Sequence, residues 1–198
     1  DGDLSDSTTF TLTVTPVNDA PEVVNASPDI SVDEDSGDVV IDLSTIFYDV
    51  ENGTNLSYSY NEDIEPVIAS LNGSILTLSL LENKYGSGIV NLYASDVVSR
   101  LSAQDSFVLT IDSVNDSPVA DDSSGQVDED SSIDIILSGS DVDGDNLTYS
   151  VGGATNGSVV LNGSTALYTP NADFSGSDSF TFSVSDGELI DDGLVNIS

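Results

Sequence analysis

Apolar and polar residues alternate with a period of two along much of this chain. Phe, Leu and Val alternate with Thr over residues 10–14, and a similar alternation returns over 107–111 and 180–184. Such alternation puts the apolar side chains on one face of a strand, so it predicts half-buried antiparallel strands. A helical period of 3.6 is not found anywhere in the sequence.

Two Asn-Gly pairs punctuate this pattern. Asn72-Gly73 and Asn162-Gly163 each stand between two runs rich in aliphatic residues. Asn-Gly is typical of two-residue hairpin turns, so each pair predicts a β-hairpin turning at these residues. With frequent Gly, Asn and Asp between short runs, the pattern predicts around seven strands in each stretch of about 95 residues.

Internal repetition sets the domain organisation. The Val-Asn-Asp at 17–19 returns at 114–116, and the Val-Asp-Glu-Asp at 32–35 returns at 127–130. The match continues over the whole unit, which is typical of tandem repeats. We expect residues 1–16 to be the tail of a preceding repeat, with complete repeats at 17–114 and 115–198. The Pro of each Asn-Asp-x-Pro segment favours an extended linker. Short strands with turn residues at this spacing predict tandem immunoglobulin-like β-sandwiches.

Composition then narrows the function. The net charge is −34, with 36 acidic and two basic residues, so we expect neither nucleic-acid nor anionic-membrane partners. A hydrophobic fraction of 38% argues against disorder. The absence of Cys excludes disulfides and thiolate metal sites, and the absence of His excludes a Ser-His-Asp triad. The sequence contains no apolar run of the ~20 residues that a membrane-spanning helix needs.

Four groups of acidic residues recur in both repeats at expected turns. They are 33–35 with 128–130, Asn-Asp at 18–19 with 115–116, Asp-Val-Glu at 49–51 with 141–145, and Asp96 with Asp186. Clustered carboxylates repel each other unless a cation lies among them. Oxygen ligands without His or Cys favour Ca²⁺. An EF-hand is excluded, because the loop starting at Asp141 has Asn146 where Gly is required and Gly152 where Glu is required.

Taken together, Asn-Asp-Ala-Pro, Asp-Glu-Asp, Asp-Val-Asp-Gly-Asp and Ser-Asp-Gly resemble the cadherin-like repeats of large bacterial secreted or surface adhesins of the RTX/Bap type. The resemblance covers the whole chain and implies tandem cadherin-like Greek-key β-sandwiches in an elongated array. It also implies calcium sites between successive domains, with ligands from both domains and the linker. The Asp-Arg-Glu element of animal cadherins is not present.

Carried over by motif, the resemblance implies one calcium site at each linker. The ligands implied for the linker near residue 115 are Glu34, Asn115, Asp116, Asp141, Asp143 and Asp186, with Asp35 and Asp145 as further candidates. Those implied near residue 18 are Asn18, Asp19, Asp49, Glu51 and Asp96. We expect the latter site to bind more weakly, since its Glu from a preceding repeat lies outside this sequence.

The expected function is therefore structural: an extracellular extender or cell-adhesion module that calcium rigidifies. The expected partners are calcium, neighbouring repeats, cell-surface glycans and other adhesin copies. One alternative is a carbohydrate- or cell-binding module of a secreted polysaccharide-degrading enzyme, with Tyr58, Tyr60, Tyr149 and Tyr168 stacking on sugars. The competing interpretation of these tyrosines is core packing, which we favour. A catalytic role is not expected, because any one pair among 36 acids is uninformative.

Overall fold

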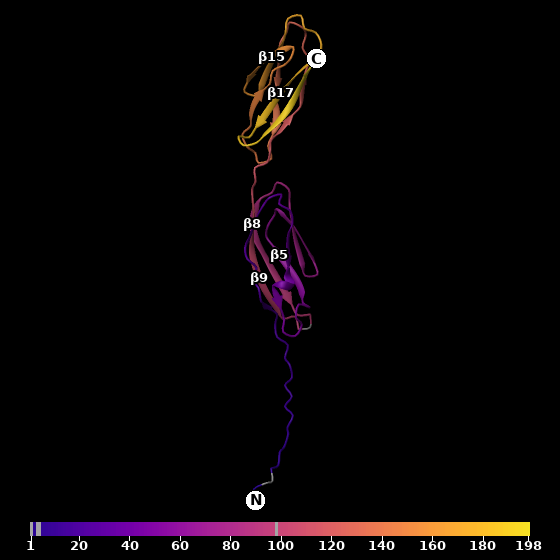
Figure 1. Ribbon diagram of the computed structural model, residues 1–198, viewed down its shortest axis with the longest axis vertical. Helices are drawn as coiled ribbons and strands as arrows, with labels where there is room; N and C mark the ends of the chain where they lie inside the picture. The colour runs from indigo at the N-terminus through magenta and orange to yellow at the C-terminus, as the bar shows by residue number, and fades with distance from the viewer. Residues whose placement is uncertain (1, 3–4, 98) are drawn as a thin grey trace. The chain divides into compact units, whose positions relative to one another are not determined.

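A computed structural model describes residues 2, 5–97 and 99–198. The chain divides into two compact units, residues 1–113 and 114–198. Each unit contains nine strands of the described chain, and Figure 1 shows each as a sandwich, the first purple and the second orange to yellow. The one helical segment in the described ranges is the short 3-10 turn η1 (Leu43–Thr45).

The first unit contains nine strands with these bounds: β1 (Glu22–Val23), β2 (Ile30–Asp33), β3 (Val39–Asp42), β4 (Phe47–Tyr48), β5 (Ser57–Glu62), β6 (Val67–Asn72), β7 (Ile75–Leu80), β8 (Gly86–Ser95) and β9 (Ser102–Asp112). The second unit follows the same order: β10 (Val119–Asp121), β11 (Ser123–Gly125), β12 (Ile133–Ile136), β13 (Ser138–Ser140), β14 (Thr148–Val151), β15 (Gly157–Asn162), β16 (Thr165–Pro170), β17 (Asp178–Ser185) and β18 (Ile190–Ile197).

Both units have the same sheet topology. In the first unit, a four-stranded sheet of order β2-β9-β8-β5 faces a three-stranded sheet of order β3-β7-β6, and β1 pairs with β4. The second unit repeats this as β11-β18-β17-β14, β12-β16-β15 and β10-β13. In each unit the edge strand β2 or β11 runs parallel to the last strand, and the other ladders are antiparallel. The predicted all-β sandwich is confirmed twice.

The buried core lies between the two sheets of each unit. Along β9 the burial alternates, with Phe107, Leu109 and Ile111 inside, as the sequence pattern predicts. Along β17 the buried side chains are Phe180, Phe182 and Val184. This alternation leaves the other face of each strand toward solvent, which is why Thr and Ser could occupy those positions.

The two expected hairpins form, but their turns lie one residue later than predicted. Asn72 pairs with Ile75, so the two-residue loop is Gly73-Ser74 and not Asn72-Gly73. The second repeat does the same, with Gly163-Ser164 as the loop. Each Gly has a φ of +64°, and neither Ser has a positive φ. A positive φ at the first loop residue alone is the requirement of a type II′ turn, which Gly-Ser satisfies better than Asn-Gly.

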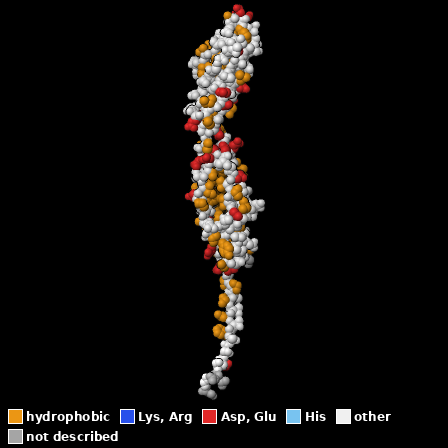
Figure 2. Space-filling view, in the orientation of Figure 1, with side chains coloured by type: hydrophobic (Ala, Val, Ile, Leu, Met, Phe, Trp, Pro, Cys, Tyr) orange, Lys and Arg blue, Asp and Glu red, His pale blue; other side chains and the backbone are white. Residues whose placement is uncertain are grey.

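The described residues that precede the first sandwich form no strand. Residues 5–21 have no regular structure, although 10–14 alternate as a strand would. Phe10, Leu12 and Val14 are 88%, 77% and 81% exposed. Figure 2 shows hydrophobic side chains along this thread. Within the described chain these three side chains therefore remain outside both cores.

In the second unit a buried tyrosine hydroxyl hydrogen-bonds a half-buried aspartate. Tyr168 on β16 is fully buried, stacks on Phe180, and donates its hydroxyl to Asp178 Oδ2 at 2.9 Å. Burial and the carboxylate raise the pKa of Tyr168 to about 12. Desolvation raises the pKa of Asp178, but hydrogen bonds from Asn156 N, from Tyr168 and from two further backbone N–H groups lower it more, so the net shift is downward.

We expect Tyr168→Phe to destabilise the second unit by about 1.5 kcal/mol or more, because it removes a hydrogen bond to a charged group. For a unit of this size that lowers the melting temperature by at least about 6 °C. The folded-state pKa of Tyr168 is raised, so its contribution is full below pH 10 and lost as the pH rises toward 12. Thermal melts across pH should therefore show the difference between Tyr168→Phe and wild type shrinking above pH 10.

The matched control is Tyr149→Phe on β14 of the same unit. The Tyr149 hydroxyl has no hydrogen-bond partner within the described part of the chain, and the ring packs against the same core. Equal destabilisation by both substitutions would contradict the importance of the Tyr168–Asp178 bond.

Candidate metal centres

One end of the second unit brings together residues from three segments. Asn115 and Asp116 precede β10, Asp143 lies in the loop after β13, and Asp186 begins the β17–β18 turn. Asn115 Nδ2 donates to Asp186 Oδ2 at 2.9 Å, and the Asp116 N–H donates to Asp143 Oδ2 at 2.8 Å. We call this group, with Asp141 and Asp145, the second acidic pole. The sequence-predicted residues at this linker therefore do meet, apart from those of the first repeat.

The Asp-Val-Asp-Gly-Asp loop is wound around Asp141. Its Oδ1 accepts from the N–H groups of Asp143 at 2.9 Å and Asp145 at 3.2 Å. Gly144 has a φ of +81°, which lets the loop turn back without steric strain. As a result, Asp141, Asp143 and Asp145 each place a carboxylate oxygen within 4.8 Å of the others. Asp141 Oδ2 is buried and has no hydrogen-bond partner.

Asp186 is held in place by neutral donors. Besides Asn115, the backbone N–H groups of Glu188 and Leu189 donate to its Oδ1 at 2.6 and 2.7 Å. The hydrogen bond from Asn115, followed by those from Glu188 and Leu189, lowers the pKa of Asp186. The carboxylate therefore stays ionised in the folded protein at any pH above the ordinary range for Asp.

The first unit has a matching pole built from equivalent positions. Asn18 Nδ2 donates to Asp96 Oδ2 at 2.7 Å, and the Asp19 N–H donates to Glu51 Oε2 at 3.2 Å. Asp49 Oδ1 accepts from the Glu51 N–H at 2.9 Å, as Asp141 does from Asp143. All five residues predicted for the linker near residue 18 therefore meet. We call them, with Asn52 and Ser99, the first acidic pole.

Two carboxylates of the first acidic pole are almost completely buried. Asp49 and Asp96 are each 1% exposed. Asp49 Oδ1 accepts three hydrogen bonds, whereas Asp49 Oδ2 is buried without a partner. Leaving an ionised oxygen buried and unsatisfied costs free energy unless a cation approaches it.

Asn52 and Ser99 were not foreseen from the sequence. Asn52 Nδ2 lies between Asp49 Oδ1 at 3.0 Å and Asp96 Oδ1 at 3.3 Å, and the Ser99 hydroxyl donates to Asp96 Oδ2 at 2.6 Å. The sequence signal that could have pointed to Asn52 is a difference between the repeats, because the first has Asp-Val-Glu-Asn where the second has Asp-Val-Asp-Gly. For Ser99 the only signal was its place three residues after Asp96. Neutral donors thus offset part of the charge in the first pole, while the second has more carboxylates and fewer donors.

The donor set of the second acidic pole fits a hard divalent cation, because Asp141, Asp143 and Asp145 bring carboxylate oxygens within 4.8 Å of one another. The acids of the first pole form no such group among the described residues, but each pole contains one buried Asp oxygen without a partner. No sulfur or imidazole is available anywhere in the sequence. Calcium takes six to eight such oxygens in flexible geometry, which suits loops better than the strict octahedron of Mg²⁺.

Glu34 and Asp35 lie elsewhere in the first unit. They occupy the turn after β2, where the Glu34 N–H donates to Asp112 O at the end of β9. The first acidic pole lies where β9 begins, so the two sites are at opposite ends of the first unit. Asp35 has a φ of 61°, and its Oδ1 accepts from the Asn83 N–H at 3.1 Å, as Asp130 does from Asp173. Asp35 therefore also has a role in holding a loop.

The four tyrosines considered for sugar stacking all belong to the cores. Tyr168 is fully buried, and Tyr58, Tyr60 and Tyr149 pack against the core of their own unit. The hydroxyls of Tyr58 and Tyr60 donate to Thr54 O and Ala69 O, both at 2.9 Å. These contacts confirm core packing and leave no stacking platform at these positions.

The comparisons with known proteins agree with the fold. Residues 115–198 match the family described as the bacterial Ig domain. This match covers the second unit alone, and the first unit repeats the same sheet topology, so both units have the fold of an immunoglobulin-like β-sandwich. No curated protein sequence matches the chain. In the described residues no helix is long and apolar enough to cross a membrane.

Solved structures give more distant similarities. An endo-fucoidan hydrolase, MfFcnA4 from glycoside hydrolase family 107, shares 19% identity, with a TM-score of 0.42 over 94% of this chain and 29% of that chain. The titin domains Z1Z2 in complex with telethonin share 12% identity, with a TM-score of 0.38 over 92% of this chain and 97% of that chain. This chain thus spans less than a third of the hydrolase, and these similarities carry no functional argument.

We expect Asp141→Asn to leave the stability of the metal-free protein unchanged or higher and to reduce the stability that calcium adds. The amide keeps an acceptor for the Asp143 and Asp145 N–H groups but removes the uncompensated charge. The metal-free melting temperature should be unchanged or higher, whereas the rise on adding calcium should shrink. At about 100 times its dissociation constant, a ligand stabilises the folded state by roughly 2.7 kcal/mol, so the loss is measurable by calorimetry.

Asp134→Asn is the control, because Asp134 lies exposed on β12 of the same unit, away from the second acidic pole. It should leave the calcium-dependent rise intact. If Asp141→Asn kept the full calcium-dependent rise in melting temperature and only lowered metal-free stability, the role of Asp141 would be to hold its loop and not to bind calcium.

Proposed function

We propose that this chain is a calcium-binding, cadherin-like repeat segment of a bacterial surface or secreted adhesin, and that calcium rigidifies it as an extender. The observation that carries the proposal is the buried Asp oxygen without a partner, found at the same position in both units. Asp49 and Asp141 each accept loop N–H groups on Oδ1, while Oδ2 is buried without a partner. A divalent cation would coordinate that oxygen and, at the same time, offset the repulsion between the clustered carboxylates.

The proposed role of the linkers follows from the contacts at each pole. The Asn of each Asn-Asp-x-Pro segment donates to the late Asp, and the following N–H donates to the Asp-x-Asp loop. The linker is therefore fastened to the same loops that would hold the ion. We propose that calcium bound here limits how freely the linker can change direction.

The two poles should differ in affinity. In the first pole Asn52 and Ser99 already supply donors to Asp49 and Asp96. The second pole holds Asp145 in addition and lacks these neutral donors among its described contacts. Extracellular calcium modules bind with dissociation constants of about 10⁻⁴ to 10⁻³ M, and we place the second pole at the tighter end. Such affinities leave the sites empty in a low-calcium cytosol and filled outside the cell.

The remaining roles in the proposal are an extracellular location, neighbouring repeats as partners, and contacts with cell-surface glycans or other adhesin copies. The match to the bacterial Ig domain family supports a non-catalytic module. The carbohydrate-module alternative loses its main support, because the tyrosines that suggested it are core residues.

Calorimetric titration with calcium should give two unequal sites, and Asp116→Ala should weaken the tighter one by about tenfold or more. The Asp116 contact to Asp143 uses the backbone N–H, so the substitution keeps it and removes only the carboxylate. Magnesium at equal concentration should give little heat. Wild-type affinity in Asp116→Ala would remove Asp116 from the site, and no calcium binding at millimolar concentration would refute the proposal.

Small-angle scattering tests the mechanical role. With calcium the chain should give a narrow distribution of conformations, and with a chelator a broader one with a changed maximum dimension. Calcium-independent scattering, with binding shown by calorimetry, would leave a calcium-binding module without a hinge function.

A further inference from the structure

The second unit has one open sheet edge. Its strand β15 (labelled in Figure 1) pairs with β16 on one side and with no strand of the described chain on the other. Asn156 O accepts from the Asn171 N–H at 2.8 Å, and in an antiparallel ladder every second residue repeats this direction. The backbone groups of Val159 and Leu161 therefore point away from β16, and within the described residues they form no hydrogen bond.

The first unit closes the equivalent edge. Ala69 on β6 stands 90 residues before Val159, and its outward carbonyl accepts the Tyr60 hydroxyl at 2.9 Å. In the second unit the position of Tyr60 is occupied by Val151, which has no hydroxyl to donate. Charged residues also discourage a strand edge from pairing with another chain. Three acids stand at the end of β5 and in the loop that leads to β6: Glu62, Asp63 and Glu65.

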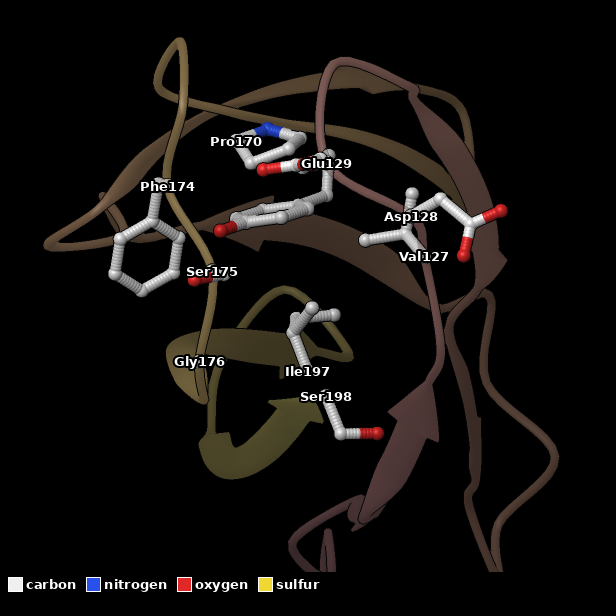
Figure 3. A pocket seen from close by; sticks show the side chains of 10 residues that line it. Val127, Asp128, Glu129, Pro170, Phe174, Ser175, Gly176, Ile197 and Ser198 are labelled. Carbon is white, nitrogen blue, oxygen red and sulfur yellow. The ribbon is translucent and has the colours of Figure 1, made fainter.

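The open edge lies in the uncharged part of a strongly acidic chain. Residues 146–172 contain no Asp, Glu, Lys or Arg, and they include β14 and β15, the neighbouring edge strands of the two sheets. By contrast, the pocket in Figure 3 has Asp128 and Glu129 in its wall. With a net charge of −34, two copies of this chain repel each other over most of their surface. The uncharged edge is where they can approach without that cost.

A row of exposed apolar side chains leads to this edge across the outer face of the sheet. Val160 on β15 pairs with Leu167 on β16, and Ile136 on β12 lies diagonally beside Leu167. At the equivalent positions the first unit has Ser70, Thr77 and Asp42. The exposed apolar residues on that face of the first unit pair only with polar residues; they are Val40, Ile68 and Ile75. The continuous apolar row is therefore a feature of the second unit.

We propose that β15 pairs antiparallel with β15 of a second copy of this chain across a two-fold axis. When Val159 pairs with Leu161 of the second copy, every outward N–H and C=O group of these residues gains a partner. Val160 then lies opposite Val160 of the second copy in the closer, non-hydrogen-bonded kind of cross-strand pair. The two apolar rows join into one, and the joined sheet has six strands.

The symmetry of this contact limits its size. Both copies use the same surface, so the contact closes as a dimer and does not extend into a fibre. A single short strand buries little area, and small interfaces are typical of weak, reversible association. The contact contains no residue of either acidic pole, so the inference does not depend on the proposed calcium function.

Sedimentation equilibrium of the full chain in chelator, over a series of protein and NaCl concentrations, tests the association. We expect a monomer–dimer equilibrium without larger species. It should tighten as NaCl rises, because salt screens the repulsion between two acidic copies while the contact itself carries no charge. Val160→Glu should weaken the dimer at least tenfold, because it places two carboxylates opposite each other on the axis.

Ile68→Glu is the matched control. Ile68 and Val160 are both 61% exposed, and they lie on the equivalent edge strands β6 and β15. Each substitution adds one negative charge at an exposed site, so thermal melts should show both variants folded. Only Val160→Glu should weaken the dimer, because the edge of the first unit is already closed by Tyr60.

Amide hydrogen exchange followed by NMR locates the contact. The N–H groups of Val159 and Leu161 should exchange more slowly as the protein concentration rises, because pairing protects them. The outward N–H groups of Ala69 and Leu71 on β6 should exchange at the same rate at every concentration. The proposal is overturned if the chain stays monomeric at millimolar concentration in high salt, or if Val160→Glu associates like wild type. It is also overturned if protection appears on β6 and not on β15, or if association requires calcium.

Discussion

A carboxylate that leaves water must find hydrogen-bond donors or a cation, and this constraint governs both acidic poles. Asp49 and Asp141 find donors for one oxygen from their own loop and none for the other. The loop geometry that satisfies the first oxygen therefore leaves the second one buried without a donor. In a chain with two basic residues against 36 acids, the protein itself offers almost no counter-charge. The loops that the fold shapes around Asp49 and Asp141 are therefore the places where the proposed calcium ions would supply the missing positive charge.

The two repeats balance the same constraint differently. The first pole uses neutral side chains, Asn52 and Ser99, to donate to buried carboxylates. The second pole keeps three carboxylates close together instead. A similar divergence occurs at the cores, where Tyr168 and Asp178 form a hydrogen-bonded pair at the positions of Leu78 and Gly88. A Cβ at Gly88 would lie 2.1 Å from Asp63 O, so the first unit cannot accept that pair.

Much of the architecture could be read from local pattern, because strand alternation and turn residues act over a few positions. The buried series Phe107, Leu109 and Ile111 follows directly from period-two alternation. The hairpin turn was misplaced by one residue, since cross-strand pairing of Asn72 with Ile75 decides which residues form the loop. The exposed strand-like residues 10–14 show the same limit, because alternation specifies a face but cannot supply a partner strand.

By itself, the sequence determined the two-repeat organisation, the all-β class and the acids that gather at each pole, because these depend on periodicity and on motifs that recur in register. Only the tertiary structure decided which oxygen of Asp49 is left without a donor, that Asn52 bridges Asp49 and Asp96, and that the tyrosines are core residues. Those outcomes depend on how the folded segments pack together, as where Asn52 reaches Asp96 across 44 residues of sequence, and no local pattern encodes that packing.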